Sequence, residues 1–286
     1  SHCLFDSVRG ATKLLSSDAN TAETTDTDTL TSFDSDGFAL GADVKVNTNT
    51  EAYVAWCWKE SATSGVDIVS YTGNGTDDTD ISHNLSAVPK MIVVKNRDAA
   101  DAWQVYHGAN TSSPETDYMV LDTTAATADA VDRWSDEAPT SSVFTLGDGA
   151  EVNTNTENYI AYCFAEKQGF SKFGSYTGNG NADGTFVYTG FKPAFFMVKN
   201  TGNLNAEWRI YDNKRDPINI DNNNVLCPHT NGATLVANEN DLDFLSNGIK
   251  IGSTDGNVNQ SGYSLIYMAF AEAPFVNSNG VPCNAR

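Results

Sequence analysis

The sequence predicts an all-β protein of tandem antiparallel β-sandwich repeats, jelly-roll or concanavalin-like, of about 105 residues each. Three observations predict it: one stretch recurs at a fixed spacing, large and small residues alternate in short runs, and the turns are rich in glycine and asparagine. An immunoglobulin-like sandwich is the alternative, but the Cys…Trp…Cys pattern of that fold is absent from the sequence.

The recurring stretch, which we call the signature stretch, occurs at 54–60, 160–166 and 266–272. From 54 to 160 and from 160 to 266 the spacing is 106 residues each time. An Asn-rich loop precedes each copy. A spacing of this size indicates tandem domains that hold their own cores, because solenoid repeats are shorter.

Alternation within the signature stretch predicts a strand. In the first copy Val54, Trp56 and Trp58 form the large face, and Cys57 lies on the small one. The small face is also apolar, so we expect both faces to be covered, with the large face filling the sandwich core. A short buried helix is the alternative, which the aromatic and β-branched content disfavours.

The repeat divides the chain into the C-terminal half of a first sandwich at 1–62, a second sandwich at 67–168, a third at 170–275 and a tail at 276–286. Relative to the second repeat, the first lacks a counterpart of about 37 residues, 67–103. A half sandwich would expose apolar faces and strand edges. We therefore expect either a longer parent polypeptide or a strand donated by another subunit.

The remaining elements are predicted from turn residues and apolar runs. Residues 17–36, rich in Ser, Asp and Thr, are predicted to be an exposed loop. Further strands are predicted at 37–41, 142–147 and 248–252, at 81–85 and 185–189, and at 89–96 and 193–200. Ser-Tyr-Thr-Gly-Asn-Gly at 70–75 and 175–180 predicts a strand that enters a tight turn. Trp103 and Trp208 repeat in the same pattern, which indicates core positions.

Composition limits the partners. The formal net charge of −20 disfavours nucleic acids and anionic membranes. The chain has no run of 18 apolar residues, so membrane insertion is not predicted. The five cysteines are odd in number, and Cys57 and Cys163 stand where the third repeat has Ala269. This pattern indicates free thiols and assembly in a reducing compartment.

One group of candidate recognition residues lies in a divergent acidic segment. Trp134 is the candidate exposed aromatic of a receptor-binding site, together with the neighbouring Arg133 and with Tyr118. Trp, Tyr and Arg are the residue types that dominate recognition surfaces.

The sequence gives weaker indications of metal binding and of enzymatic activity. Asp43, Asp148 and Asp255 recur near the loop before each signature stretch, where carboxylates and backbone carbonyls would suit Ca²⁺. The 37 acidic residues place chance carboxylate pairs everywhere, so a glycosidase-like pair carries little weight. The four histidines do not repeat between copies and form no recognisable Ser/His/Asp or Cys/His arrangement. The sequence therefore predicts a protein without enzymatic activity, a degradative enzyme being the least favoured alternative.

Several motifs resemble a repeat family of marine bacteriophage virion proteins. They are Ser-Tyr-Thr-Gly-Asn-Gly, the apolar runs that end in Val-Lys-Asn, the closing Ala-Phe-Ala-Glu at 269–272, and Phe-Asp-Ser-Val-Arg-Gly-Ala at 5–11. The resemblance spans nearly the whole chain and implies a tail fibre or another surface appendage. It also implies assembly in the host cytoplasm, a location on the virion surface, and association with other virion proteins and with copies of itself, as a trimer. The motifs are structural and carry over no catalytic residue.

We therefore expect a scaffold that displays the variable segments 110–141 and 213–247 for attachment to a host cell-surface glycan or protein. The alternative is a carbohydrate-binding, lectin-like module of a secreted or surface protein.

Overall fold

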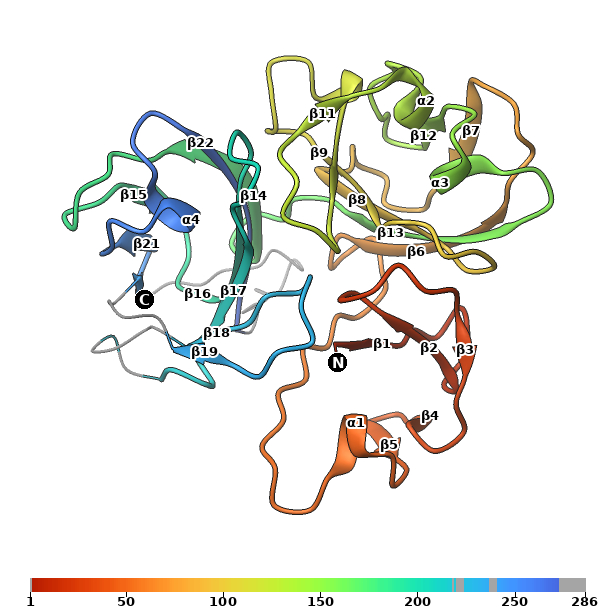
Figure 1. The fold of residues 1–286 in the computed structure, drawn as a ribbon, viewed down its shortest axis with the longest axis horizontal. Helices are drawn as coiled ribbons and strands as arrows, with labels where there is room; N and C mark the ends of the chain where they lie inside the picture. Colours follow the sequence, from red (N-terminus) through yellow and green to blue (C-terminus); the bar gives the residue numbers. More distant parts are fainter. Residues whose placement is uncertain (1, 218, 220–223, 237–240, 273–286) are drawn as a thin grey trace.

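The computed structural model describes residues 2–217, 219, 224–236 and 241–272, and it confirms the all-β fold class. Three lobes surround a common centre (Figure 1). We call them unit 1 (residues 2–62), unit 2 (66–164) and unit 3 (171–271). The domain boundaries predicted from the sequence stay predictions, and the predicted tail at 276–286 lies outside the described residues.

Unit 2 is a two-layer antiparallel sandwich. Its large sheet has the order β11-β10-β9-β8-β13-β6, and its small sheet pairs β12 with β7. The strands of the large sheet are β6 (Val66–Thr72), β8 (Met91–Asn96), β9 (Gln104–His107), β10 (Asp117–Val120), β11 (Ala128–Asp129) and β13 (Asn158–Phe164). Those of the small sheet are β7 (Thr79–Ser82) and β12 (Val143–Leu146).

Unit 3 repeats this topology. Its large sheet has the order β14-β22-β16-β17, so β22 lies between β14 and β16 as β13 lies between β6 and β8. These strands are β14 (Ser171–Thr177), β16 (Pro193–Asn200), β17 (Trp208–Asp212) and β22 (Ser264–Ala271). The small sheet contains β15 (Phe186–Tyr188), β20 (Leu242–Leu245) and β21 (Gly248–Ile251), and a separate ribbon pairs β18 (Asn224–Val225) with β19 (Leu235–Val236).

In units 2 and 3 the signature stretch is a strand that is buried on both faces, as expected. The assignment of the faces differs from the expectation. Tyr159, Ala161 and Cys163, on the small face of β13, pack against the second sheet of unit 2. Ile160 and Phe164, on the large face, point into a core that all three units share. The large face therefore joins the units instead of filling a sandwich.

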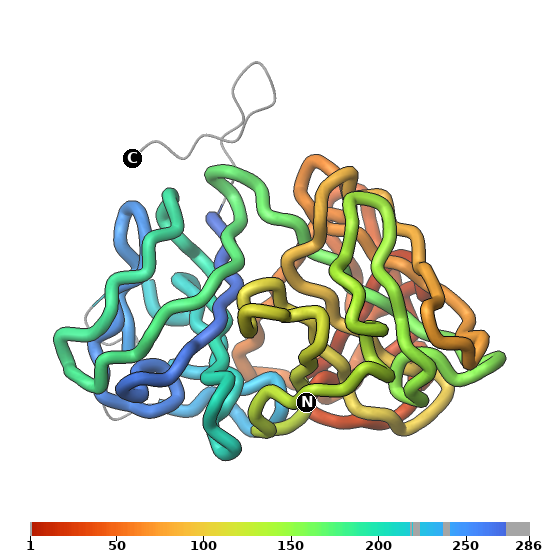
Figure 2. The backbone as a smooth tube through the Cα atoms, turned by 90° about the horizontal axis from the view of Figure 1, so that it is seen from above, coloured from red at the N-terminus to blue at the C-terminus, as the bar shows by residue number. Residues whose placement is uncertain are grey.

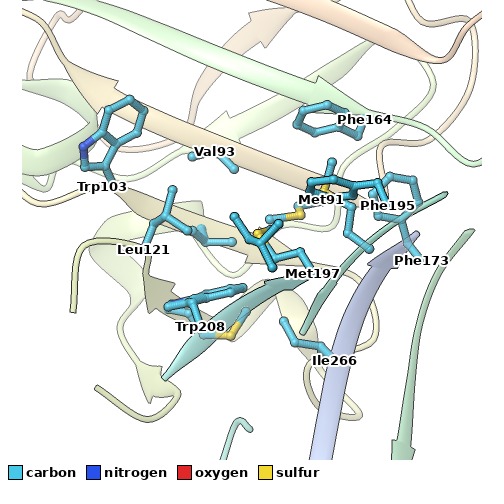
Figure 3. Close-up of a cluster of buried hydrophobic side chains, with 14 of the residues drawn as sticks. Met91, Val93, Trp103, Leu121, Phe164, Phe173, Phe195, Met197, Trp208 and Ile266 are labelled. Carbon is cyan, nitrogen blue, oxygen red and sulfur yellow. The ribbon is translucent and has the colours of Figure 1, made fainter. Parts of the chain in front are cut away.

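Figure 3 shows this shared core, with Met91 and Trp103 of unit 2 opposite Met197 and Trp208 of unit 3. Both tryptophans are fully buried, as predicted. Strands β8 and β16, which carry Met91 and Met197, are buried on both sides because each large sheet is the middle layer between its own small sheet and the shared core.

Three aromatic rings from equivalent positions meet in this core. Trp58, Phe164 and Phe270 each hold the fifth position of their signature stretch. The ring centroids are 6.5 Å apart for Trp58 and Phe164, 5.7 Å for Trp58 and Phe270, and 6.4 Å for Phe164 and Phe270, all edge to face. We call these residues the aromatic triangle. They mark a pseudo-threefold centre within one chain.

Unit 1 holds only part of the same pattern. A sheet of the order β1-β2-β3 contains β1 (Cys3–Leu4), β2 (Lys13–Ser16) and β3 (Thr24–Thr25), and β4 (Leu30–Phe33) pairs with β5 (Phe38–Leu40). By pairing and register these strands match β9, β10 and β11 of unit 2 and β20 and β21 of unit 3.

Two expectations for unit 1 are wrong. The first signature stretch is not a strand, because unit 1 offers no counterparts of β6 and β8 among the described residues to pair with it. Cys57 is exposed for the same reason, whereas Cys163 is buried. The segment 17–36 is also more than a loop, since it holds β3 and β4 and buries Leu30.

The helices of the described chain are single turns. They are α1 (Val44–Asn47), α2 (Val131–Trp134), α3 (Ala150–Asn153), α4 (Gly256–Asn259) and the 3-10 turn η1 (Pro114–Thr116). Among them, none has the length or apolar character to cross a membrane. The predicted tight turns are present, with φ of +66° at Gly75 and +68° at Gly180. Cys57, Cys163 and Cys227 are free thiols, as expected, while Cys283 lies outside the described residues.

The aromatic triangle predicts a specific loss of stability. Phe164→Ala removes a buried ring that contacts units 1 and 3, so we expect the free energy of unfolding to fall by about 3–5 kcal/mol in urea titrations. Phe186→Ala, at an exposed position of β15, is the control and should change it by less than about 0.5 kcal/mol. Equal effects of the two substitutions would contradict the shared core.

Candidate functional site

Buried polar side chains connect neighbouring units. At the junction of units 1 and 2, the Arg9 guanidinium is fully buried and pairs with the Asp6 carboxylate. The Tyr162 hydroxyl of unit 2 donates to Asp6 at 2.8 Å and accepts from Arg9 at 3.2 Å. Burial raises the pKa of Tyr162, so its hydroxyl keeps the proton that it donates.

The junction of units 3 and 1 repeats the motif. Asp212 accepts from the Arg215 backbone N–H at 3.0 Å and from its Nε at 2.6 Å, as Asp6 does from Arg9. The Arg215 guanidinium lies 6.0 Å from the ring centroid of Trp56, which is the counterpart of Tyr162 in unit 1. Each Asp–Arg pair therefore contacts an aromatic residue in the signature stretch of the next unit.

At the junction of units 2 and 3, His107 takes the place of the aspartate. Its Nε2 lies 3.1 Å from the Tyr267 carbonyl oxygen, and its Nδ1 accepts from the Ala109 N–H at 3.2 Å. This places the proton on Nε2, which donates to the carbonyl. Burial lowers the pKa of His107 to about 4, so the ring is neutral at pH 7.

Two tryptophan N–H groups add hydrogen bonds at the junction of units 1 and 2 and at the junction of units 2 and 3. Trp103 of unit 2 donates to the Ser16 carbonyl of unit 1 at 3.1 Å. Trp208 of unit 3 donates to the Val120 carbonyl of unit 2 at 2.9 Å. Together with the ion pairs and His107, these bonds close the three units into a ring.

A polar hollow of about 320 Å³ opens beside His107 between units 2 and 3. It is lined by Lys90, His107, Gly108, Ala109, Glu166, Lys172 and Phe173. Lys172 is already paired with Glu166 at 2.8 Å. Both nitrogens of His107 are engaged, so the imidazole offers a ligand neither a base nor an acid. Among these lining residues there is no nucleophile paired with a base.

The candidate receptor residues are brought together, but inside unit 2. The Arg133 guanidinium lies 5.0 Å from the Tyr118 ring centroid and pairs with Glu151 at 3.0 Å. Trp134 is only 2% exposed and packs edge to face on Tyr106. The expectation of an exposed Trp134 is wrong, because α2 turns this side chain into the core beneath the small sheet.

The three aspartates of the candidate calcium site lie in three different units. Asp43 and Asp255 cap α1 and α4 by accepting backbone N–H bonds at 2.7 and 2.8 Å, and Asp255 also pairs with Arg209 at 3.0 Å. Asp148 is exposed. Within the described ranges no three His, Cys, Asp or Glu side chains gather as a metal site would require. The acidic recurrence therefore reflects helix capping at two of the three positions.

The variable segments are largely structural where they are described. In 110–141, Met119 and Leu121 are buried in the shared core, and the Thr127 N–H donates to the Thr201 carbonyl of unit 3. In 213–247, Leu226 lies in the shared core and Leu242 in the core of unit 3. Residues 218, 220–223 and 237–240 lie outside the described part. In the described parts of 110–141 and 213–247, the sequence diverges at junctions between units as well as at the surface.

A family model described as a domain of unknown function, DUF7483, matches residues 1–274. The chain belongs to this family. Comparison with curated proteins gave no match, and comparison with solved structures gave none either. The description assigns the DUF7483 family no activity, so the function of this member has to be argued from its own residues.

The junction residues of this DUF7483 chain were missed by the sequence reasoning, although a signal was present. Asp and Arg stand three residues apart at 6–9 and again at 212–215, at equivalent places in units 1 and 3. Repetition of a charged pair at equivalent places of two units indicates that the pair belongs to the shared structure of the units. His107 breaks this pattern in unit 2 and gave no such signal.

Breaking the buried pair should be costly. Asp6→Asn removes the carboxylate that pairs with the Arg9 Nε and leaves Glu23, at 3.1 Å, as the remaining counter-charge of the buried guanidinium, so we expect a loss of about 1.5–3 kcal/mol in unfolding free energy by urea titration. Glu272→Gln, which alters the exposed pair with Lys214, is the control and should cost about 0–1 kcal/mol. A small effect of Asp6→Asn would show that this junction does not hold units 1 and 2 together.

His107 predicts a pH dependence of stability. Between pH 4 and the ordinary histidine pKa of 6.5, the unfolded chain binds a proton that the folded chain excludes. Stability is therefore complete above pH 6.5 and declines as the pH falls toward 4, by on the order of 3 kcal/mol. His107→Gln keeps a donor for Tyr267 but cannot titrate. Unfolding titrations should show a shallower acid decline for this variant, and identical pH profiles would contradict a buried neutral His107.

Proposed function

We propose that this chain is a non-enzymatic structural protein of a phage virion, part of a tail fibre or another surface appendage. The observation that carries the proposal is the ring of three related units, two complete and one partial, around one aromatic core. Its buried residues serve packing and junctions between units. Such an arrangement suits a rigid building block more than a site that has to open and close.

The resemblance to virion proteins supports the same role. The motifs that carry it, Ser-Tyr-Thr-Gly-Asn-Gly and the runs that end in Val-Lys-Asn, form the strands and turns of the large sheets. The negative charge keeps copies soluble before assembly. In this proposal the partners are other virion proteins and further copies of the chain, as a trimer, and the chain is located on the virion surface after assembly in the host cytoplasm.

Carbohydrate binding is the second candidate, and one observation favours it. Phe186 and Tyr188 lie on the same side of β15 and are 44% and 63% exposed. Neighbouring exposed aromatics of this kind stack on sugar rings. In this proposal host attachment would use the outer sheet of unit 3 and not the buried Trp134.

The virion role is tested by following the chain through purification of phage particles. Particles banded in a density gradient should contain this chain in a fixed ratio to the other virion proteins, as measured by quantitative mass spectrometry. Its presence only in the soluble part of the lysate would contradict the proposal.

A glycan array tests the second candidate. Binding that is lost in a Phe186→Ala, Tyr188→Ala double variant, and retained in Tyr53→Ala, would assign sugar recognition to β15. Equal binding by the two variants, or no binding by the unaltered chain, would count against it. Neither result depends on whether the chain is found in virions.

A further inference from the structure

Unit 1 exposes a face that is core in the other two units. Its Tyr53 is 48% exposed, whereas the equivalent Tyr159 and Leu265 are fully buried. Phe38 and Leu40 of β5 are 38% and 39% exposed, whereas their counterparts in β12 and β21 are at most 1% exposed. Ala55 and Cys57 continue the same exposed row. Apolar residues at four or more neighbouring core positions indicate a face built to be covered.

The polar groups beneath this face already hold the geometry of a complete unit. Tyr53 donates to the Val44 carbonyl at 2.9 Å, as Tyr159 donates to Ala150 at 2.6 Å. Asn47 donates to the Gly41 carbonyl at 2.7 Å, as its counterpart Asn153 donates to Gly147. The hydrogen bonds around α1 are therefore already formed although nothing covers them in unit 1. Asn47 is exposed, whereas its counterpart Asn153 is fully buried.

The complete units show what covers the equivalent part of the fold. In unit 2, β6 and β8 pair with β13 on its two sides, and Ile92 and Val94 of β8 pack on its small face. Tyr71 of β6 donates to the Val152 carbonyl at 2.8 Å. In unit 3, β14 and β16 do the same, with Phe196 and Val198 on the face and Tyr176 as the donor.

The turn after β6 or β14 completes the contact. The Asn74 N–H donates to the amide oxygen of Asn153 at 2.9 Å, and the Asn179 N–H does the same to Asn259. Gly73 approaches so closely that a Cβ would lie 2.2 Å from the Thr154 carbonyl oxygen. Asn47 and Thr48 are the equivalent acceptors in unit 1. A partner for unit 1 therefore needs Gly-Asn at this turn, a tyrosine before it, and a second strand with two large apolar residues two apart.

We propose that the exposed face of unit 1 is the docking surface for a strand pair of the β6–β8 kind that precedes β1 in the same polypeptide. The source follows from the order of elements. In units 2 and 3 the pair stands directly before the counterpart of β1, through the short connections 97–103 and 201–207. His2 occupies the place of Trp103, and it is half-buried beside the Thr230 backbone of unit 3. The pair would turn the signature stretch at 54–60 into a central strand and close the third sandwich.

The test joins a copy of residues 66–102 to His2, so that His2 follows as Trp103 does in unit 2. Cys57 reports on the outcome because it is exposed now and its counterpart Cys163 is fully buried. We expect reaction of Cys57 with a thiol reagent, followed by mass spectrometry of the labelled peptide, to slow by at least about tenfold. Cys163 is the internal reference, and it should stay unreactive in both chains.

The matched control carries Ile92→Asp and Val94→Asp in the copied segment only, which places charges on the packing face. It should leave Cys57 as reactive as in the unaltered chain. Where the joined chain fails to fold, a synthetic peptide of residues 66–97 added to the unaltered chain gives the same readout in trans. Protection by the peptide supports the proposal, and no protection at saturating peptide overturns it.

Two further results would overturn the proposal. One is unchanged Cys57 reactivity in a folded joined chain. The other is concentration-dependent protection of Cys57 in the unaltered chain together with a dimer in sedimentation, which would make a second copy the partner. The inference goes beyond the virion role and does not depend on it, so its failure would leave that proposal standing.

Discussion

Trp58, Phe164 and Phe270 meet edge to face at the centre of the molecule, each from the same position of its signature stretch. Rings of this size bury about 150–250 Å² each, and edge-to-face pairs add about 0.5–1.5 kcal/mol beyond that burial. The three copies of the signature stretch bring three such rings together only if their large faces turn inward. The small faces are then left for the sandwich of each unit, which is why Ala161 and Ala269 lie against the second sheets.

This arrangement also accounts for the junctions and for the state of unit 1. Once the large faces share a core, the rim of each unit lies against its neighbour, and buried polar groups there need partners. Asp6 with Arg9, His107, and Asp212 with Arg215 supply them at successive junctions. Unit 1 keeps its position through Trp56 and Trp58 although its own sandwich is open. Figure 2 shows the connection between β13 and β14, in green, crossing from unit 2 to unit 3.

Much of this fold could be predicted from the sequence. The spacing of 106 residues located β13 and β22, and the Pro-led apolar runs located β8 and β16. The direction of the large face could not be predicted, because both faces of the signature stretch are apolar and alternation alone does not say which neighbour each face meets. The prediction that Trp134 is exposed was wrong for another reason. Sequence divergence between copies can reflect a change of neighbouring residues and does not by itself indicate exposure to solvent. The first signature stretch was predicted to be a strand and is not one, because strand pairing depends on segments that are distant in the sequence.

Because the three units share one core, they should fold as one body. Differential scanning calorimetry tests it most directly, because it compares the measured enthalpy with the enthalpy expected for a two-state transition. A shared core predicts one transition for the whole chain, with the two enthalpies equal. Two or three separable transitions, with a calorimetric enthalpy well above the two-state value, would show that the units are independent domains and would contradict the account.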